Sequence, residues 1–195
     1  MPHATEGGSD STAAGKGERM PRIEPIPFED LSEDTLRRIE AGTATGMYST
    51  PVPLQILAHS PLAVRALDDG YKAHFRTGSL EPRLQELLRL RSSQLNACQP
   101  CSASRKEETV SEQDVACLDD PEAGRYTRRE GLALRFLDLF ATDHHAITDD
   151  TFAQLGQEFT TEQVVELGWL CAQSLGIHRL MHTLDVLGTG PAVLH

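Results

Sequence analysis

The sequence predicts an all-α fold, and three observations support this prediction. Leucines recur at helical spacing through residues 81–97, which gives that segment an apolar face. Two segments begin with the pattern of a capping box, one at Thr127 and one at Thr160. No segment alternates apolar and polar residues between hairpin turns, and no motif repeats at a fixed period. Helices therefore account for all the regular structure that we expect.

Prolines and N-cap residues divide the first half of the chain. The segment 21–27 contains too many prolines to be helical throughout. Ser60 is a suitable N-cap for the helix that follows it, with Pro61 in the first turn, where its missing N–H costs nothing. The expected helices span residues 31–42, 51–59, 60–78 and 81–97.

The second half of the sequence predicts five more helices. The first begins with Cys98 and Cys101 and continues through residues 102–109, which contain no helix breaker. A short helix from Ser111 carries Cys117. The remaining helices begin at Thr127 (with Glu130 in the box), Thr151 (ending at Phe159) and Thr160 (with Gln163). Their predicted buried residues are Ala133, Phe136, Leu137 and Phe140, then Val164, Leu167, Leu170, Cys171, Leu175 and Leu180, and the last helix is expected to be central and the most buried.

Length and composition indicate one folded domain. The 195 residues, 39% of them hydrophobic, are enough for one sizeable core. Residues 1–20 are rich in Gly, Ser, Thr and Ala and have no apolar run, so they are neither a signal peptide nor a membrane anchor. We expect a disordered segment over residues 1–25 and a helical domain over residues 26–195.

Charge excludes two classes of partner. The formal net charge of −11 argues against a surface that binds nucleic acid or anionic lipid, because both need clustered Lys and Arg. No run approaches the roughly 20 apolar residues that cross a bilayer. We therefore expect a cytoplasmic protein. In a reducing cytoplasm, a close pair among four cysteines indicates metal binding or redox chemistry rather than a structural disulfide.

The most informative motif is Cys98-Gln99-Pro100-Cys101. Two thiols at this spacing can close a disulfide, hold a metal or attack an oxidant. At a helix N-terminus Cys101 is favoured as a thiolate, and Arg105 one turn later adds a positive charge on the same face. If Cys101 is oxidised to a sulfenic acid, Cys98 can attack it and close a disulfide.

Two other interpretations of the pair stay open. The cysteines can be small apolar core residues. Alternatively, Cys98, Cys101, Cys117 and Asp120 have the spacing of a four-ligand zinc site. Zinc sites of this spacing usually lie on turns rather than on a helix, so we expect no metal and no cofactor.

Three further residues are candidates for chemistry. Glu86 lies on the Leu-rich helix before the cysteines, where a Glu is more often solvated than catalytic. His178 and His182 lie one turn apart on the final helix, a spacing that suits a metal, although packing in the core is the more common role.

Glu86, the segment 87–96 and Cys98-x-x-Cys101 together resemble the carboxymuconolactone decarboxylase and AhpD-like alkylhydroperoxidase superfamily, over about residues 50–187. The resemblance implies an AhpD-like helical bundle. It also implies that Cys101 reacts with peroxide, that Cys98 resolves the product and that Glu86 relays protons. Arg105 replaces the relay His of the family, and a guanidinium cannot release its proton near neutral pH. Pro100 stands where some members carry another His.

A replacement for the missing imidazole is available in the sequence. His144 and His145 follow the helix that begins at Thr127. Imidazole titrates near pH 6.5, so either residue suits proton transfer at the thiols. The alternative is a solvated helix end, where His complements the helix dipole.

The resemblance implies a thiol-dependent peroxidase or disulfide oxidoreductase in antioxidant defence. Its partners would be a hydroperoxide substrate and a thiol reductant, and family members assemble as homotrimers or as hexamers built from trimers. Two alternatives remain. The decarboxylase branch acts on a lactone without the thiol pair, and a non-catalytic redox sensor would be oxidised only once.

Overall fold

The computed structural model describes residues 21–122 and 124–186, and all the regular structure in them is helical, which confirms the all-α prediction. Nine α-helices and three short turns of other helix types follow one another in these ranges. They are η1 (Phe28–Asp30), α1 (Glu33–Ala44), α2 (Val52–Leu57), α3 (Pro61–Lys72), η2 (Ala73–Thr77), α4 (Pro82–Leu95), α5 (Gln99–Ala103), α6 (Glu112–Ala116), α7 (Arg128–Thr142), η3 (His144–Ala146), α8 (Asp149–Leu155) and α9 (Thr161–Leu184).

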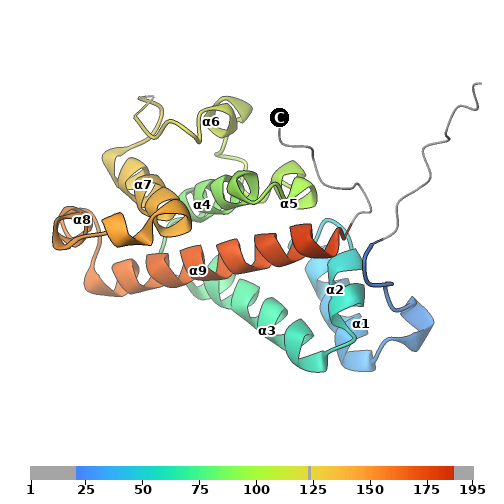
Figure 1. Ribbon diagram of the computed structural model, residues 1–195. Coiled ribbons are helices and arrows are strands. Elements are labelled where there is room, and N and C mark those ends of the chain that lie inside the picture. Colours follow the sequence, from blue (N-terminus) through green and yellow to red (C-terminus); the bar gives the residue numbers. More distant parts are fainter. Residues whose placement is uncertain (1–20, 123, 187–195) are drawn as a thin grey trace, which may run out of the picture.

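The long helix α9 runs through the middle of the molecule (Figure 1). Helices α4 and α7 pack along one side of it, and α1, α2 and α3 lie on the other side. The short helix α5 continues from the end of α4 beside the C-terminal half of α9, whereas α8 lies at the opposite end of the molecule. Cys98, just before α5, packs against Ile56 of α2 and Met181 of α9.

The N-caps predicted at Ser60, Thr127 and Thr160 are confirmed, because each side chain accepts a hydrogen bond from the backbone N–H three residues later. Ser32 caps α1 in the same way. At Thr127 and Thr160 the capping box is complete, because the third residue also accepts from the cap N–H. Helix α3 continues as the π-helical η2 up to Gly78, as expected.

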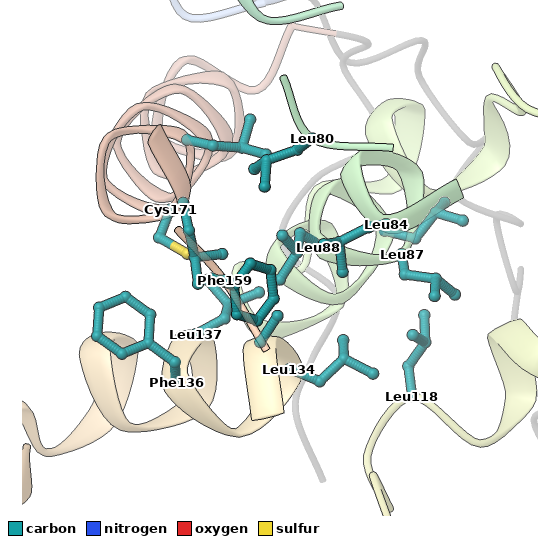
Figure 2. Close-up of a cluster of buried hydrophobic side chains, with 14 of the residues drawn as sticks. Leu80, Leu84, Leu87, Leu88, Leu118, Leu134, Phe136, Leu137, Phe159 and Cys171 are labelled. Carbon is teal, nitrogen blue, oxygen red and sulfur yellow. The ribbon is translucent and has the colours of Figure 1, made fainter. Parts of the chain in front are cut away.

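The main core lies between α4, α7 and α9 (Figure 2). It contains Leu87 and Leu88 of α4, Leu134 and Leu137 of α7, and Cys171 of α9. The prediction that α9 is the most buried helix is wrong. Nine of the 14 residues of α4 are buried, against seven of the 24 residues of α9, because several elements pack around α4 while α9 presents one face outward.

The outward face of α9 corrects a second expectation. Leu180, predicted to be buried, is 41% exposed, as are large parts of Val165 and Trp169 on the same helix. Leu167, Leu170 and the other apolar residues one turn apart face the core instead. Helix α9 is thus apolar on two faces, and the described residues of the chain cover only one of them.

A buried carboxylate fixes α1 against α3. Asp68 is fully buried and accepts hydrogen bonds from Arg38 at 2.5 Å, Lys72 at 2.6 Å and the Tyr48 hydroxyl at 2.9 Å. Burial alone would raise the pKa of Asp68, but these three donors outweigh it and lower the pKa below its usual value. Asp68 therefore holds Tyr48 in position over α3, next to the site described below.

Two predicted helices have other bounds. The prediction that the Cys-bearing helix continues through residues 102–109 is wrong. Helix α5 ends at Ala103, and the chain is extended at Ser104. The buried pair Glu86–Arg89 takes backbone groups that a longer helix would have used internally. The helix expected over residues 151–159 runs from Asp149 to Leu155.

The expected domain boundary at residue 25 falls in a described segment. The N–H of Arg22 donates to the carbonyl of Leu184 at 2.9 Å, and the N–H of Ile26 donates to the carbonyl of Gln55 at 3.2 Å. Residues 1–20 of the segment predicted to be disordered, and residues 187–195 of the helical domain, lie outside the described residues. In the described part of the chain, no helix combines the length and the apolar character needed to span a bilayer.

Candidate active site

Cys98 and Cys101 form a disulfide, with their Cα atoms 5.3 Å apart. The two sulfur positions differ in access. Cys98 is 1% exposed and packs in a small apolar cluster with Ile56, Met181 and Val186, whereas Cys101 is partly exposed. A reagent in solution therefore reaches Cys101 and not Cys98.

A sharp turn between α4 and α5 places the pair. Ala97 has φ +47°, in the left-handed region that favours glycine. Its N–H donates to the carbonyl of Gln94, and the N–H of Cys98 donates to the carbonyl of Ser93 at 2.9 Å. These two bonds are those of a Schellman motif, which ends α4 and starts α5 within three residues.

Helix α9 holds this turn from the side. The Arg179 guanidinium donates to the side-chain oxygen of Asn96 at 2.8 Å, and Nδ1 of His182 lies 3.1 Å from the carbonyl oxygen of Ala97. Both contacts join residues more than 80 positions apart in the sequence. The location of Cys98 thus depends on the packing of α9 against α4.

A buried ion pair on α4 fixes the backbone next to the two cysteines. Glu86 and Arg89 are 1% and 2% exposed, and both carboxylate oxygens accept from the guanidinium at 2.7 Å. The remaining donors of Arg89 bind the carbonyl of Cys101 at 2.6 Å and that of Ser104 at 2.8 Å. The N–H of Lys106 donates to Glu86 at 2.9 Å. Glu86 and Arg89 therefore fix the backbone on both sides of Ser104 and end α5 there.

Cys101 opens onto a cavity of about 70 Å³. Helix α3 contributes Leu67 and Tyr71 to its wall, and α9 contributes Ile177, His178 and Met181. Tyr48 and other residues between α1 and α2 form the opposite side. Burial raises the pKa of Tyr71, so its phenol stays neutral at physiological pH.

The charged residues in the wall of this cavity are both cationic. They are Arg89 and Lys106. Burial, followed by the nearby Arg89 guanidinium, lowers the pKa of Lys106 to about 8, so that its ammonium form prevails near neutral pH. The Lys106 ammonium donates to the backbone carbonyls of Met47 and Gly46. Because Glu86 compensates the charge of Arg89, Lys106 supplies the positive charge that favours an anion in this cavity, such as the thiolate of reduced Cys101.

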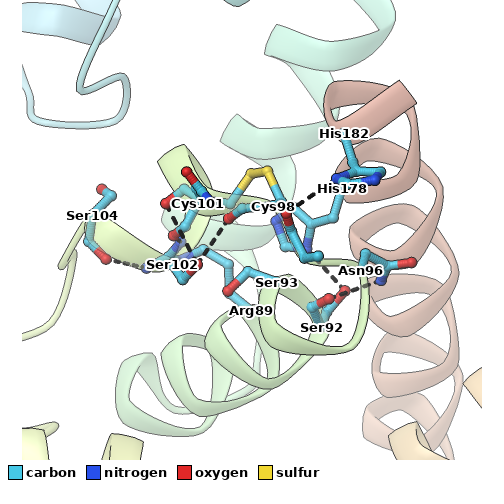
Figure 3. The surroundings of a disulfide bond; sticks show 12 residues. Arg89, Ser92, Ser93, Asn96, Cys98, Cys101, Ser102, Ser104, His178 and His182 are labelled. Carbon is cyan, nitrogen blue, oxygen red and sulfur yellow. Dashed lines mark hydrogen bonds between the residues drawn. A yellow bond between two sulfur atoms is a disulfide. The ribbon is translucent and has the colours of Figure 1, made fainter. Parts of the chain in front are cut away.

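His178 of α9 lies beside the disulfide (Figure 3). It is 1% exposed, and its Nδ1 atom is 2.9 Å from the Ser92 hydroxyl of α4. Burial, with a further contribution from the positive charge of Arg89, lowers the pKa of His178 to about 3. The imidazole is therefore neutral at physiological pH.

Three residues proposed from the sequence are not brought to the thiols. Arg105 follows the end of α5 and pairs with Glu112 at 2.7 Å, and this hydrogen bond raises the Arg105 pKa. It does not line the cavity of Cys101. His144 and His145 are exposed in η3, on the segment that leads to α8, with their rings 4.1 Å apart. Neither imidazole lines the cavity.

The zinc interpretation is not supported by the geometry. Over residues 21–122 and 124–186, no three His, Cys, Asp or Glu side chains gather closely enough to hold a metal ion. Cys117 and Asp120 therefore do not join Cys98 and Cys101. Three residues proposed from the sequence do come together, namely Cys98, Cys101 and Glu86. Glu86 is connected to the cysteines through Arg89, which donates to both Glu86 and the carbonyl of Cys101.

Sequence reasoning missed Arg89 and Lys106 and treated His178 as a core or metal residue. One signal was available for Arg89, because Glu86 and Arg89 are three residues apart and share a face of an otherwise apolar helix. The cavity position of Lys106 and His178 depends on how distant segments pack, which local spacing does not reveal.

No family model matches the sequence, and no curated protein is similar to it. Solved structures do match the fold. The AhpD core of an uncharacterized peroxidase-related protein from Ralstonia eutropha JMP134 has a TM-score of 0.71 and 21% identity, over 86% of this chain and 91% of that one. The debrominase Bmp8 has a TM-score of 0.69 and 16% identity, over 83% and 88%. A protein of unknown function from Agrobacterium tumefaciens, described as a "putative antioxidant defence protein AhpD", matches with a TM-score of 0.59 and 23% identity, over 66% of this chain and 92% of that one. The chain has the AhpD-like all-helical fold.

Proposed function

We propose that the protein is a thiol-dependent peroxidase that cycles between a dithiol and the Cys98–Cys101 disulfide. The observation that carries this proposal is the asymmetry of the pair. Cys101 opens onto a cationic cavity, while Cys98 is buried within disulfide distance of it. This arrangement suits a nucleophile that meets the substrate and a second thiol that meets only the nucleophile. The AhpD-like fold of the structural neighbours is consistent with this chemistry.

The proposed cycle has three steps. The Cys101 thiolate attacks one oxygen of a hydroperoxide, the O–O bond breaks, and an alcohol leaves after protonation. The Cys98 thiol then attacks the sulfur of the Cys101 sulfenic acid, which forms the disulfide and releases water. A dithiol reductant attacks the accessible Cys101 sulfur, forms a mixed disulfide and then completes the reduction by its own disulfide closure. We propose a reducing cytoplasm as the setting, because a dithiol reductant there would reopen the disulfide.

The proposal assigns the electrostatic role to Lys106 rather than to Arg105. Lys106 lines the cavity with Cys101, whereas Arg105 lies outside it and is held by Glu112. The charge of Arg89, which also lines the cavity, is compensated by Glu86. Glu86 is a positioning residue in this scheme, because its carboxylate is occupied by Arg89 and by the N–H of Lys106.

Substitution of the cysteines tests the cycle. We expect Cys101→Ser to abolish consumption of an organic hydroperoxide in the presence of a dithiol, because the nucleophile is lost. Cys98→Ser is expected to react once and to accumulate a sulfenic acid, detectable by mass spectrometry. Cys117→Ser is the matched control and should retain wild-type turnover. A lactone decarboxylase would survive Cys101→Ser, and a redox sensor would stop after one equivalent of peroxide, so either result would contradict the proposal.

The assignment of the cationic group is tested by Lys106→Met and Arg105→Met. Loss of the Lys106 charge should raise the pKa of the Cys101 thiol by about one unit and slow its reaction at neutral pH about tenfold. Arg105→Met should change the rate less than about twofold, because its guanidinium is screened by Glu112. The measurement is the pH dependence of alkylation of Cys101 in the reduced protein. If Arg105→Met raised the pKa of the Cys101 thiol more than Lys106→Met does, Arg105 rather than Lys106 would stabilise the thiolate, which would contradict the assignment.

We further propose that the chain forms a homotrimer, or a hexamer built from two trimers, through the outward face of α9. This face, which we call the α9 strip, consists of Val165, Trp169 and Leu180, which are 68%, 65% and 41% exposed. A hollow of about 450 Å³ between α3 and α9 lies beside Trp169 and Leu180. Large apolar side chains gathered on one face are typical of contacts between subunits.

Trp169→Glu tests the role of the α9 strip. A charge placed in an apolar contact between subunits would be desolvated, so we expect the particle mass to fall to that of one chain. The mass is measured by size exclusion with light scattering. Phe28→Glu is the control, since Phe28 is 47% exposed in η1 and lies outside the strip. An unchanged oligomer in the Trp169 variant would place the contact elsewhere.

A further inference from the structure

In the described part of the chain, one residue in the wall of the Cys101 cavity has a buried nitrogen without a hydrogen-bond partner. In the described residues, three buried side-chain nitrogens lack a partner, namely His74 Nε2, Arg129 Nη2 and His178 Nε2. Of these three residues, His178 alone lines the cavity that contains Cys101. Buried polar atoms without partners are rare in folded proteins, and a catalytic or redox role is one of the reasons for which they are kept.

In the reduced protein the buried Cys98 thiol must be deprotonated before it can react, and His178 is a base that can accept this proton. Burial in apolar surroundings disfavours a thiolate, and in this molecule burial strongly raises the pKa of the Cys171 thiol. Cys98 is equally buried, at 1% exposure, and packs against Ile56, Met181 and Val186. The reduced Cys98 thiol must nevertheless lose its proton when it attacks Cys101, so a base is required next to it.

The neighbouring elements offer few alternatives. Helix α9 contributes His178 and His182, and Nδ1 of His182 is already at the Ala97 carbonyl. Helix α4 contributes Arg89, which cannot accept a proton, and Glu86, which is occupied by Arg89. Lys106 from the segment after α5 and the neutral Tyr71 of α3 complete the surroundings. In His178 the contact between Nδ1 and the Ser92 hydroxyl fixes the ring, and Nε2 has no hydrogen-bond partner.

We propose that His178 is the proton-transfer residue for Cys98. In this assignment the Nδ1–H of His178 donates to the Ser92 hydroxyl, which leaves the lone pair of Nε2 directed at the site. The inference rests on the proposed function in that it concerns the resolving step, but it requires only that Cys98 attack an oxidised Cys101.

The proton balance closes within the step. Nε2 accepts the proton of the Cys98 thiol as the sulfur attacks the Cys101 sulfenic acid. The new S–S bond forms as the S–O bond breaks, and the imidazolium returns the proton to the departing hydroxide, which leaves as water. In the reverse direction, the proton that the reductant thiol releases as it attacks Cys101 passes through Nε2 of His178 to the departing Cys98 thiolate.

A test that needs no peroxide uses an aromatic disulfide reagent on the reduced protein. Cys101 displaces the first aromatic thiolate and forms a mixed disulfide with the reagent. Cys98 then attacks the Cys101 sulfur, which forms the Cys98–Cys101 disulfide and releases the second aromatic thiolate. The experiment uses a Cys117→Ser background, so that this other thiol does not contribute. We expect His178→Asn to leave the first release unchanged and to slow the second about 100-fold at neutral pH. Added imidazole should restore part of the second rate.

His74→Asn is the matched control, because Nε2 of His74 is also buried without a partner but His74 does not line the cavity, and it should change the second release less than about threefold. If His178→Asn does not fold, as judged by circular dichroism, His178→Gln replaces it, because an amide keeps polarity near Nε2 without a basic nitrogen. A second release at the wild-type rate in the folded variant would overturn the proposal. A wild-type protein that shows the His178-dependent second release but no peroxide turnover would contradict the proposed function and leave this inference standing.

Discussion

The site depends on one buried interaction, the ion pair between Glu86 and Arg89. Two opposite charges removed from water are costly unless every donor and acceptor is satisfied. Here they are, because Arg89 binds the carbonyls of Cys101 and Ser104 and Glu86 accepts from the N–H of Lys106. The pair therefore sets the backbone around the thiols. It ends α5 after one turn, turns Lys106 toward the cavity and leaves Arg105 outside.

The second constraint is the strained turn at Ala97, which α9 holds through Arg179 and His182. Together the turn and the ion pair produce the difference between the sulfur atoms, one in an apolar cluster and one at a cationic cavity. The chemistry that we propose needs this difference. An equally exposed pair would give no reason for one thiol to meet the substrate first, and an equally buried pair would be inaccessible to both oxidant and reductant.

Much of the fold could be predicted from the sequence, because its determinants are local. Capping residues such as Thr127 and Thr160, and prolines such as Pro61, fixed the starts of helices within a residue or two. The errors arose where tertiary contacts overrode local preference. Residues 102–109 contain good helix formers, yet Lys106 donates its N–H to Glu86, 20 residues earlier in the chain. Similarly, the thiol motif and Glu86 were identifiable, but the place of His178 depends on the packing of α9 against α4.

The order in which the two thiols react is the most direct test of this account. Reduced protein can be treated for short times with an alkylating reagent, and the modified cysteines can then be identified by mass spectrometry of peptides. The account predicts that Cys101 is modified at least about tenfold faster than Cys98, because the thiolate forms at the accessible position and the buried thiol is protected. Equal rates, or faster modification of Cys98, would contradict it.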